Sequence, residues 1–287
     1  MTTLTSPSSV TLSSVHSQPT FSPTSIAYLN LLNRVLVEGE SEVAPRGKAT
    51  LELVDTYFVV DNPDSKPIVT HDLERNKVIA DYTKKEFDLY YSEKANMAYE
   101  FGEASKFWLS LANPDGSLNS CYGALIFGQA TCGNPQFNMA RYVGHWPLSD
   151  EERLAAESDP NTALVTPWQW AVNSLLMDKS SRQAYVRFSR PDHQWIGNRD
   201  QVCTMHGQFQ IRHDRLNLTI IMRSNDLIRG LVYDMPFFVS LLEKMQSELV
   251  RKYPSLRIGQ YRHFSHSSHV YEADIAKAKA MLGVDEF

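Results

Sequence analysis

Cys203 is the residue of this chain with the clearest capacity for covalent chemistry, because cationic side chains lie near it. Arg199 and His206 are close in sequence, and a hairpin would bring Arg223 beside it. The thiolate is the reactive form of cysteine, and a free thiol with a pKa of about 8.5 is only slightly ionised near neutral pH. Neighbouring cations increase the thiolate fraction, so Cys203 is a candidate nucleophile. The alternative is an inert buried cysteine, the better interpretation of an arbitrary single cysteine.

Two other kinds of site are weaker candidates. His263, His266 and His269 could belong to a metal site, but no second cluster with matching spacing accompanies them. Surface or hydrogen-bonding histidines are the better interpretation, and no metal is expected. No glycine-rich phosphate loop follows a predicted strand, since Gly207 and Gly230 stand alone. This pattern argues against the common nucleotide-triphosphate and dinucleotide folds.

The elements that would position Cys203 are a β-hairpin and a helix. Apolar residues alternate with polar ones on both sides of a polar turn at 213–215, which is the period of a hairpin. These apolar residues are Phe209, Ile211, Leu216, Leu218 and Ile220. The hairpin ends at 223–226, and three- and four-residue spacing after Gly230 predicts an amphipathic or buried helix. Its apolar residues are Phe237, Phe238, Leu241, Leu242, Met245 and Leu249.

Most of the remaining chain is predicted to form further helices and strands. A helix capped by Ser25 is expected to end at 38–40, followed by strands at 51–54 and 57–60. Most of 84–108 is predicted to be helical, with Glu86 at its start. Residues 113–116 form a turn by residue type, and 122–128 form a buried stretch. A helix over 162–177, a strand over 184–188 and a short helix over 275–281 complete the prediction.

The composition is that of an ordinary globular protein. The chain has 287 residues, 43% of them hydrophobic and 21% charged, which is enough for a substantial core. Its net charge of -5 gives no general electrostatic reason to bind a nucleic acid polymer, although a few local arginines suffice for a nucleotide. Cys121, Cys132 and Cys203 cannot all pair within the chain, and no membrane span or secretory signal is apparent. A reducing, cytoplasmic location is therefore expected, which for a viral protein is the host cytoplasm.

Residues 1–24 differ from the rest of the chain. Ser, Thr and Pro dominate this segment, which carries almost no charge, and such a composition is typical of a disordered leader. We expect residues 25–287 to form a single catalytic domain.

Several short motifs occur in one order along the chain. Cys203 is followed by Gln208-Phe209, the predicted hairpin, Arg223-Ser224-x-Asp226, Gly230 and a polar residue at 234. The flanking motifs are Arg46-Gly47, Glu86, Trp108, Asp115-Gly116-x-Leu118, Tyr122-Gly123, Ser181-Arg182 and His269-Val270-Tyr271. Together they resemble the thymidylate synthase family from about residue 46 to residue 271. Each motif is weak alone, but the shared order is hard to obtain by chance.

The resemblance implies a fold and a reaction. The fold would be of the α/β (α+β) class, with a large mixed sheet backed by helices and a homodimer formed through the sheet. The substrates would be a pyrimidine nucleoside monophosphate and 5,10-methylenetetrahydrofolate. The thiolate of Cys203 would add to carbon 6 of the base, which makes carbon 5 nucleophilic toward the one-carbon unit.

The resemblance also implies roles for the other motif residues. The phosphate would be held by Arg46 and Arg223, and by Arg182 from the other subunit, because guanidinium groups offer planar paired donors. Further substrate contacts would come from Gln208, Ser224, His269 and Tyr271, the last two at the sugar. Glu86 would organise water and proton transfer, and the folate side of the site would be formed by Trp108, Tyr122, Asp226 and Gly230. Without the shared order, solvated surface charges would be the better interpretation of Arg223 and Glu86.

Asp234 departs from the pattern of the synthases, which have asparagine at this position. An amide complements the carbonyl at position 4 and the N–H at position 3 of uracil, whereas cytosine reverses both groups. A carboxyl group can accept from the exocyclic amine of cytosine and, when protonated, donate to ring nitrogen 3. Sites of this kind can reject a mispaired analogue by factors of about 10⁴, and the residue resembles that of the deoxycytidylate hydroxymethylases in the family. Alternatively, Asp234 simply caps the helix before Pro236.

Three further departures concern the folate and the phosphate. The chain ends at Phe287, soon after Tyr271, whereas synthases have a longer tail that covers the folate during hydride transfer. A short tail would admit water to the intermediate and give a hydroxymethyl group instead of a methyl group. Arg229 stands where an apolar residue near the folate is expected, and Gln183 stands where many members have a second arginine.

The sequence therefore predicts a cytidylate 5-hydroxymethyltransferase, with dCMP favoured over CMP. One alternative is a pyrimidine nucleotide methyltransferase, either a thymidylate synthase or a dCMP methylase. The other is an inactive relative that binds a nucleotide or RNA, although the presence of Cys203 argues against it.

Overall fold

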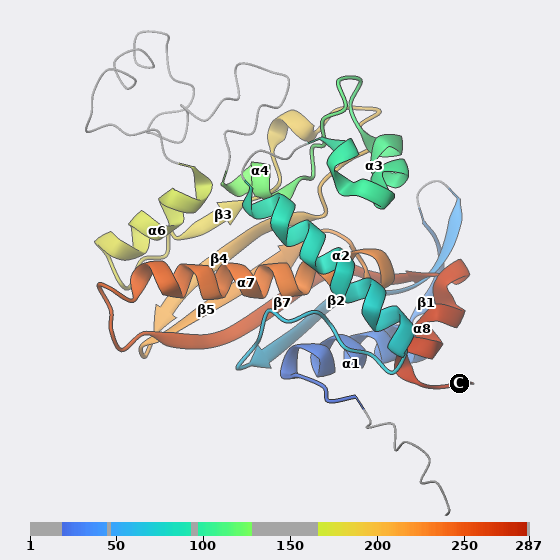
Figure 1. The fold of residues 1–287 in the computed structure, drawn as a ribbon, viewed down its shortest axis with the longest axis horizontal. Coiled ribbons are helices and arrows are strands. Elements are labelled where there is room, and N and C mark those ends of the chain that lie inside the picture. Colours follow the sequence, from blue (N-terminus) through green and yellow to red (C-terminus); the bar gives the residue numbers. More distant parts are fainter. Residues whose placement is uncertain (1–18, 45–46, 93–96, 128–165, 286–287) are drawn as a thin grey trace, which may run out of the picture.

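The computed structural model describes residues 19–44, 47–92, 97–127 and 166–285. Within these ranges the chain forms one mixed sheet with helices packed against it (Figure 1). The predicted fold class is confirmed, and the leader residues 1–18, Cys132 and Arg46 lie outside the described residues.

The seven-stranded sheet has the order β1-β2-β7-β5-β4-β3, and the short β6 pairs with β7. Strand β7 runs parallel to β5 and β6, while the other pairs are antiparallel. The strands are β1 Glu40–Ala44, β2 Lys48–Asp61, β3 Tyr185–Arg187, β4 Thr204–Arg212, β5 Arg215–Met222, β6 Asn225–Asp226 and β7 Arg257–Tyr271.

The predicted hairpin is β4–β5. His213 and Asp214 form its turn, and both have positive φ, 52° and 56°, as a two-residue hairpin turn requires. Phe209, Ile211 and Leu218 on its apolar face are almost completely buried. The hairpin therefore brings the residues before β4 next to those after β5.

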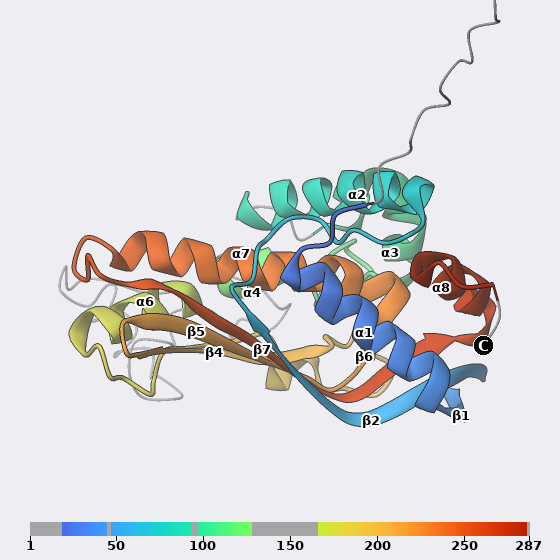
Figure 2. The same cartoon turned by 90° about the horizontal axis from the view of Figure 1, so that it is seen from below.

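Helices α1, α2 and α7 gather on one side of the sheet (Figure 2). The helical segments are α1 Pro23–Glu38, α2 Leu73–Tyr91, η1 Ala98–Ala104, α3 Ser105–Leu111, α4 Tyr122–Ile126, α6 Pro167–Met177, η4 Pro191–His193, η5 Leu227–Leu231, α7 Val232–Leu249, η6 Glu272–Asp274 and α8 Ile275–Leu282. Helix α7 contacts β5, β7 and α2, and its apolar residues are buried as the spacing predicted. It is the central helix of the core.

The boundaries of several predicted elements were wrong. Ser22, not Ser25, caps α1, because its hydroxyl accepts from the amide of Ser25 at 3.2 Å, so Pro23 and Thr24 belong to the helix and not to the leader. The two strands predicted at 51–54 and 57–60 form one strand, β2, which continues through Asp55 at a positive φ of 50°.

The helix predicted over 84–108 is divided among three segments. Helix α2 begins before it, at Leu73, so Glu86 lies in the second half of a helix and not at its start. From Ala98 the chain forms η1 and then α3, and Gly102 within η1 takes a φ of 58°. The predicted helix over 162–177 begins at Pro167 after a capping box formed by Thr166 and Gln169, and residues 162–165 lie outside the described ranges.

Candidate active site

The hairpin places Arg223 against Cys203. The Arg223 amide donates to the Cys203 carbonyl at 2.9 Å, and its Nη2 lies 3.7 Å from the sulfur. The guanidinium also donates to the carbonyls of Val202 at 2.9 Å and Gln201 at 2.6 Å. Arg223 thus fixes the backbone that carries the thiol and supplies the positive charge next to it. His206, by contrast, points from β4 toward the opposite face of the sheet, where it lines a pocket.

The Cys203 thiol is held in its neutral form in the free protein. Burial raises its pKa to about 11, against the charge of Arg223, which lowers it. The carboxylates of Asp234, Asp200 and Asp226 raise it further. Burial and the three carboxylates thus favour the neutral thiol, and Arg223 favours the thiolate.

Asp234 and Asp226 flank Gly230. A Cβ at residue 230 would lie 3.5 Å from Oδ2 of Asp234 and 3.9 Å from Cβ of Asp226, so the glycine lies next to both side chains. Asp226 opens the π-helical segment η5, because its Oδ1 accepts from the amides of Ile228 at 2.9 Å and Arg229 at 3.0 Å.

Asp234 is not a helix cap. It is the third residue of α7, whose N-cap position is Leu231, so the capping alternative is wrong. Burial raises the pKa of its carboxyl to about 7, the charge of Asp226 raises it further, and a hydrogen bond from Tyr122 lowers it. Near neutral pH this carboxyl can both carry a proton and accept a hydrogen bond.

Glu86 reaches the same site from α2. Its side chain is buried, Tyr90 donates to Oε1 at 3.5 Å, and Oε2 has no partner among the described residues. Burial and the charge of Asp234 raise its pKa to about 8, while hydrogen bonds from Tyr82 and Tyr90 lower it. Trp108 joins this network, since its Nε1 donates to the Tyr82 hydroxyl at 3.1 Å.

Tyr122 connects the two halves of the site. Its hydroxyl lies 2.8 Å from Thr204 Oγ1, directly after Cys203 in the chain, and it also hydrogen-bonds Asp234. Its ring stacks on Phe237 and Phe238 of α7. The phenol is thereby held between Thr204, which begins β4 next to Cys203, and α7, which carries Asp234.

His269 and Tyr271 lie at the end of β7. His269 pairs with Asp226 across β6 and β7. Burial raises the pKa of the Asp226 carboxyl, and the nearby His269 opposes this shift. The ring of Tyr271 stands edge-on to His269 at 5.4 Å, between the cations of Lys48 and Arg229. Arg229 is fixed by Asp274, which it contacts through two nitrogens at 2.9 and 2.6 Å.

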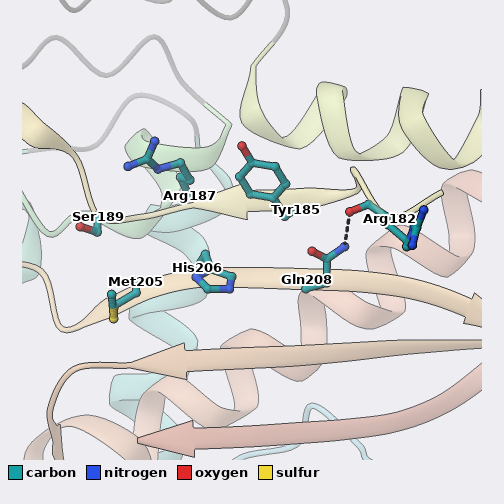
Figure 3. Close-up of a pocket in the computed structure, with 7 residues that line it drawn as sticks. All are labelled: Arg182, Tyr185, Arg187, Ser189, Met205, His206 and Gln208. Carbon is teal, nitrogen blue, oxygen red and sulfur yellow. Dashed lines mark hydrogen bonds between the residues drawn. The ribbon is translucent and has the colours of Figure 1, made fainter. Parts of the chain in front are cut away.

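Two predicted substrate residues lie elsewhere. Arg182 and Gln208 line a pocket of about 430 Å³ on the sheet face opposite α7, together with Tyr185, Arg187, Ser189, Met205 and His206 (Figure 3). The Gln208 amide donates to the carbonyls of Arg182, Ala184 and Phe209. Side chains alternate along β4, so Gln208 and buried Phe209 point to opposite faces. Ser224 is half-buried in the connection between β5 and β6.

Sequence reasoning missed Tyr82, Tyr90, Thr204 and Asp200. Tyr82, Glu86 and Tyr90 recur at four-residue spacing on α2, and this spacing was a signal that they share one face. Asp200 is buried and accepts from the amide of Ser120 at 2.9 Å, a contact between distant segments that leaves no local trace in the sequence.

The described ranges contain no group of three or more His, Cys, Asp or Glu that could hold a metal ion. Within the same ranges, no helix has the length and hydrophobicity of a membrane span.

Comparison with known proteins adds a family and several named relatives. A family model described as thymidylate synthase matches residues 26–286. The chain is 24% identical over 222 residues to the deoxycytidylate 5-hydroxymethyltransferase of Enterobacteria phage T4, covering 76% of this chain and 73% of that one, with the same values for phage T2. It is 25% identical over 253 residues to the deoxyuridylate hydroxymethyltransferase of Bacillus phage SP01, covering 86% of this chain and 57% of that one.

Proposed function

The chain belongs to the thymidylate synthase family, and we propose that within it this protein is a deoxycytidylate 5-hydroxymethyltransferase. In the proposed reaction dCMP, 5,10-methylenetetrahydrofolate and water give 5-hydroxymethyl-dCMP and tetrahydrofolate, without hydride transfer. The observation that carries the proposal is the Asp234 carboxyl, which lies beside Gly230 in the region of Cys203.

Asp234 selects the base in this proposal. With a pKa near 7, the carboxyl is partly protonated at neutral pH, donates to ring nitrogen 3 of cytosine and accepts from the exocyclic amine. Uracil presents a carbonyl oxygen and an N–H at these positions, so with the proton on the carboxyl oxygen that faces ring position 3 both of its groups would face like groups. A mispaired buried polar group costs about 1–3 kcal/mol or more, which supports a preference for cytosine.

Cys203 is the nucleophile. Its thiol loses a proton, the sulfur bonds to carbon 6, and the bond breaks again when the product leaves. Arg223 next to the sulfur favours the thiolate. The same guanidinium, together with Ser224 and Arg46, binds the phosphate, and Arg182 reaches it from a second subunit of a homodimer.

Glu86 handles protons at the base. Burial keeps its carboxyl protonated near neutral pH, and Oε2 is unsatisfied among the described residues, so this oxygen is available to a water molecule or to the base. The charge of Asp234 adds to the effect of burial on Glu86, so the protonation of Glu86 depends on that of Asp234.

The remaining side chains suit the folate and the sugar. The folate supplies the one-carbon unit. Trp108, held by Tyr82 and packed on Phe101 at 4.8 Å, offers a fixed aromatic surface, while Asp226, Tyr122 and Gly230 complete that side. His269 and Tyr271 bind the sugar hydroxyl, and Gln208 supports the segment that carries Arg182.

The test is to incubate the protein with methylenetetrahydrofolate and, separately, dCMP, CMP or dUMP, and to measure product mass. The expected product is 5-hydroxymethyl-dCMP with release of tetrahydrofolate. Hydroxymethylation of dUMP is the second candidate, favoured by the deoxyuridylate relative. Release of dihydrofolate with a methylated product would contradict both, and no turnover in any arm would indicate an inactive nucleotide- or RNA-binding protein.

A further inference from the structure

A buried polar group lies beneath the site and has no part in the proposed reaction. Asn225, Tyr261 and His263 are each at most 1% exposed. The Asn225 amide nitrogen lies 3.1 Å from Nε2 of His263, and the Tyr261 hydroxyl lies 2.7 Å from Nδ1. Both ring nitrogens of the imidazole are therefore engaged.

His263 is a neutral and rigid group. Burial lowers its pKa to about 3, and its ring stacks on Phe58 at 5.0 Å with 16° between the planes. A neutral imidazole has one donor and one acceptor nitrogen, so Nε2 accepts from the Asn225 amide and Nδ1–H donates to the Tyr261 hydroxyl. The ring stays uncharged over the pH range in which the protein would work.

Asn225 depends on this imidazole. Its Oδ1 has no partner among the described residues, so the bond to His263 is the contact that fixes its side chain. Asn225 lies in β6 opposite Ser268 of β7, while the preceding strand β5 ends at Met222 opposite Ser265. Residues 223–224 therefore connect two stretches that pair with β7. They are held on one side by β5 and on the other by Asn225.

The connection and its neighbours carry functional groups. Arg223 braces the backbone of Cys203 and contacts its sulfur, and Asp226 opens the segment that contains Gly230. A shift of Asn225 would move these groups relative to the thiol. Burying the polar side chains of Asn225 and His263 costs free energy unless their hydrogen bonds are made. A role in positioning neighbouring groups accounts for their presence.

We propose that His263, held by Tyr261 and Phe58, is a positioning residue that fixes Asn225 and thereby aligns Arg223 with Cys203 and with the substrate phosphate. The phosphate part of this proposal rests on the proposed function, whereas the alignment of Arg223 with the thiol does not.

The test compares His263→Phe, which keeps a flat ring but removes both hydrogen bonds, with His263→Gln, which keeps an amide able to bond Asn225. Asn225→Ala and the double variant His263→Phe/Asn225→Ala complete the set. The two readouts are KM for dCMP and the pH midpoint of Cys203 alkylation by iodoacetamide, identified by peptide mass. Tyr91→Phe is the control, since it removes a 2.7 Å hydrogen bond to Ser240 between α2 and α7.

We expect His263→Phe and Asn225→Ala each to raise KM about tenfold, the effect of losing one buried hydrogen bond. Both should move the alkylation midpoint upward, because the thiolate loses the alignment of Arg223. His263→Gln should restore much of both values, and the double variant should be no worse than Asn225→Ala. Tyr91→Phe should lower the melting temperature and leave both readouts unchanged.

The proposal is overturned if His263→Phe and Asn225→Ala lower the melting temperature without moving the alkylation midpoint, or if their effects add in the double variant. If His263→Phe does not fold, Asn225→Ala and His263→Gln decide by the same criteria. Failure of the proposed function, seen as no turnover of dCMP, is distinguishable because the alkylation midpoint needs no substrate.

Discussion

At the residue scale, burial favours the neutral, protonated forms of three side chains of the site. The pKa of Cys203 is raised to about 11, that of Glu86 to about 8 and that of Asp234 to about 7. Groups with pKa values in this range can change protonation state when their surroundings change. Of the cations that the sequence indicated, Arg223 contacts the thiol.

From the raised pKa of Glu86 we predict how the stability of the folded protein depends on pH. Because the folded state raises this pKa from 4.5 to about 8, the folded protein binds the proton more tightly than the unfolded chain. The group therefore costs no stability below about pH 4 and becomes progressively unfavourable as pH rises to about 8. Glu86→Gln removes this cost, so its melting temperature relative to the unmodified protein should increase from pH 5 to pH 8, while turnover falls.

The control for this measurement is Glu74→Gln on the same helix, which changes an exposed side chain paired with Lys77. Its melting temperature difference should stay nearly constant with pH. A difference for Glu86→Gln that does not change between pH 5 and pH 8 would show that the carboxyl is not protonated in the folded protein.

The sequence predicted Cys203 and Arg223 together because a hairpin with clear period-two alternation separates them. It did not predict Asp200, whose contact with Ser120 joins segments far apart in the chain, and it overlooked the four-residue spacing that places Tyr82 and Tyr90 beside Glu86. The placement of Gln208 on the opposite face follows from strand alternation counted from buried Phe209 and could have been predicted from the sequence.

At the element scale, Arg229 joins η5 to the C-terminal segment. Its guanidinium contacts Asp274, whose side chain is 6% exposed, and Lys277 contacts the same carboxylate at 2.9 Å. Burial raises the pKa of Asp274, but the hydrogen bond from Lys277 and the charge of Arg229 outweigh it, so the net pKa is lowered. Stability from this group is present above the unfolded pKa and is lost as pH falls through the folded value.

Asp274→Asn should therefore destabilise the protein at pH 7 by about 1 kcal/mol, because the buried side chain loses its ion pairs with Arg229 and Lys277, which are 46% and 43% exposed and so screened by solvent. Urea unfolding at pH 7 and pH 3 measures this, and the difference should shrink at the lower pH. Glu38→Gln breaks the exposed pair with Arg34 and should cost at most about 0.5 kcal/mol. Equal effects of the two substitutions would contradict the structural role of Asp274.

Helix existence was easier to predict than helix position. The spacing of apolar residues identified α7 and the short α8, because their buried faces repeat regularly. Most of 84–108 was predicted to be helical, without the start of α2 at Leu73 or the positive φ of Gly102, because neither has a strong signal in composition. Glu86 was therefore placed at a helix start.

At the scale of the whole molecule, the sheet face opposite α7 carries exposed apolar and basic side chains. Tyr57 and Tyr185 are 52% and 40% exposed, and Arg182 and Arg187 line the pocket on this face. An apolar surface of this kind suits a homodimer formed through the sheet, in which Arg182 reaches the site of the other subunit.

Subunit mixing tests this arrangement. Cys203→Ser and Arg182→Ala should each be inactive alone, whereas a mixture refolded together should recover about a quarter of the unmodified activity, since each mixed dimer has one intact site. A mixture that remains inactive, while each variant folds and dimerises, would place Arg182 outside the partner's site.

The most direct measurement of the central claim is the ratio of kcat/KM for dCMP to kcat/KM for dUMP in the unmodified protein and in Asp234→Asn. The unmodified protein should prefer dCMP. The amide of Asp234→Asn, which pairs with uracil, should reverse the preference toward dUMP. A preference for dUMP in the unmodified protein, or the same ratio in both proteins, would contradict the role of Asp234 as the residue that chooses the base.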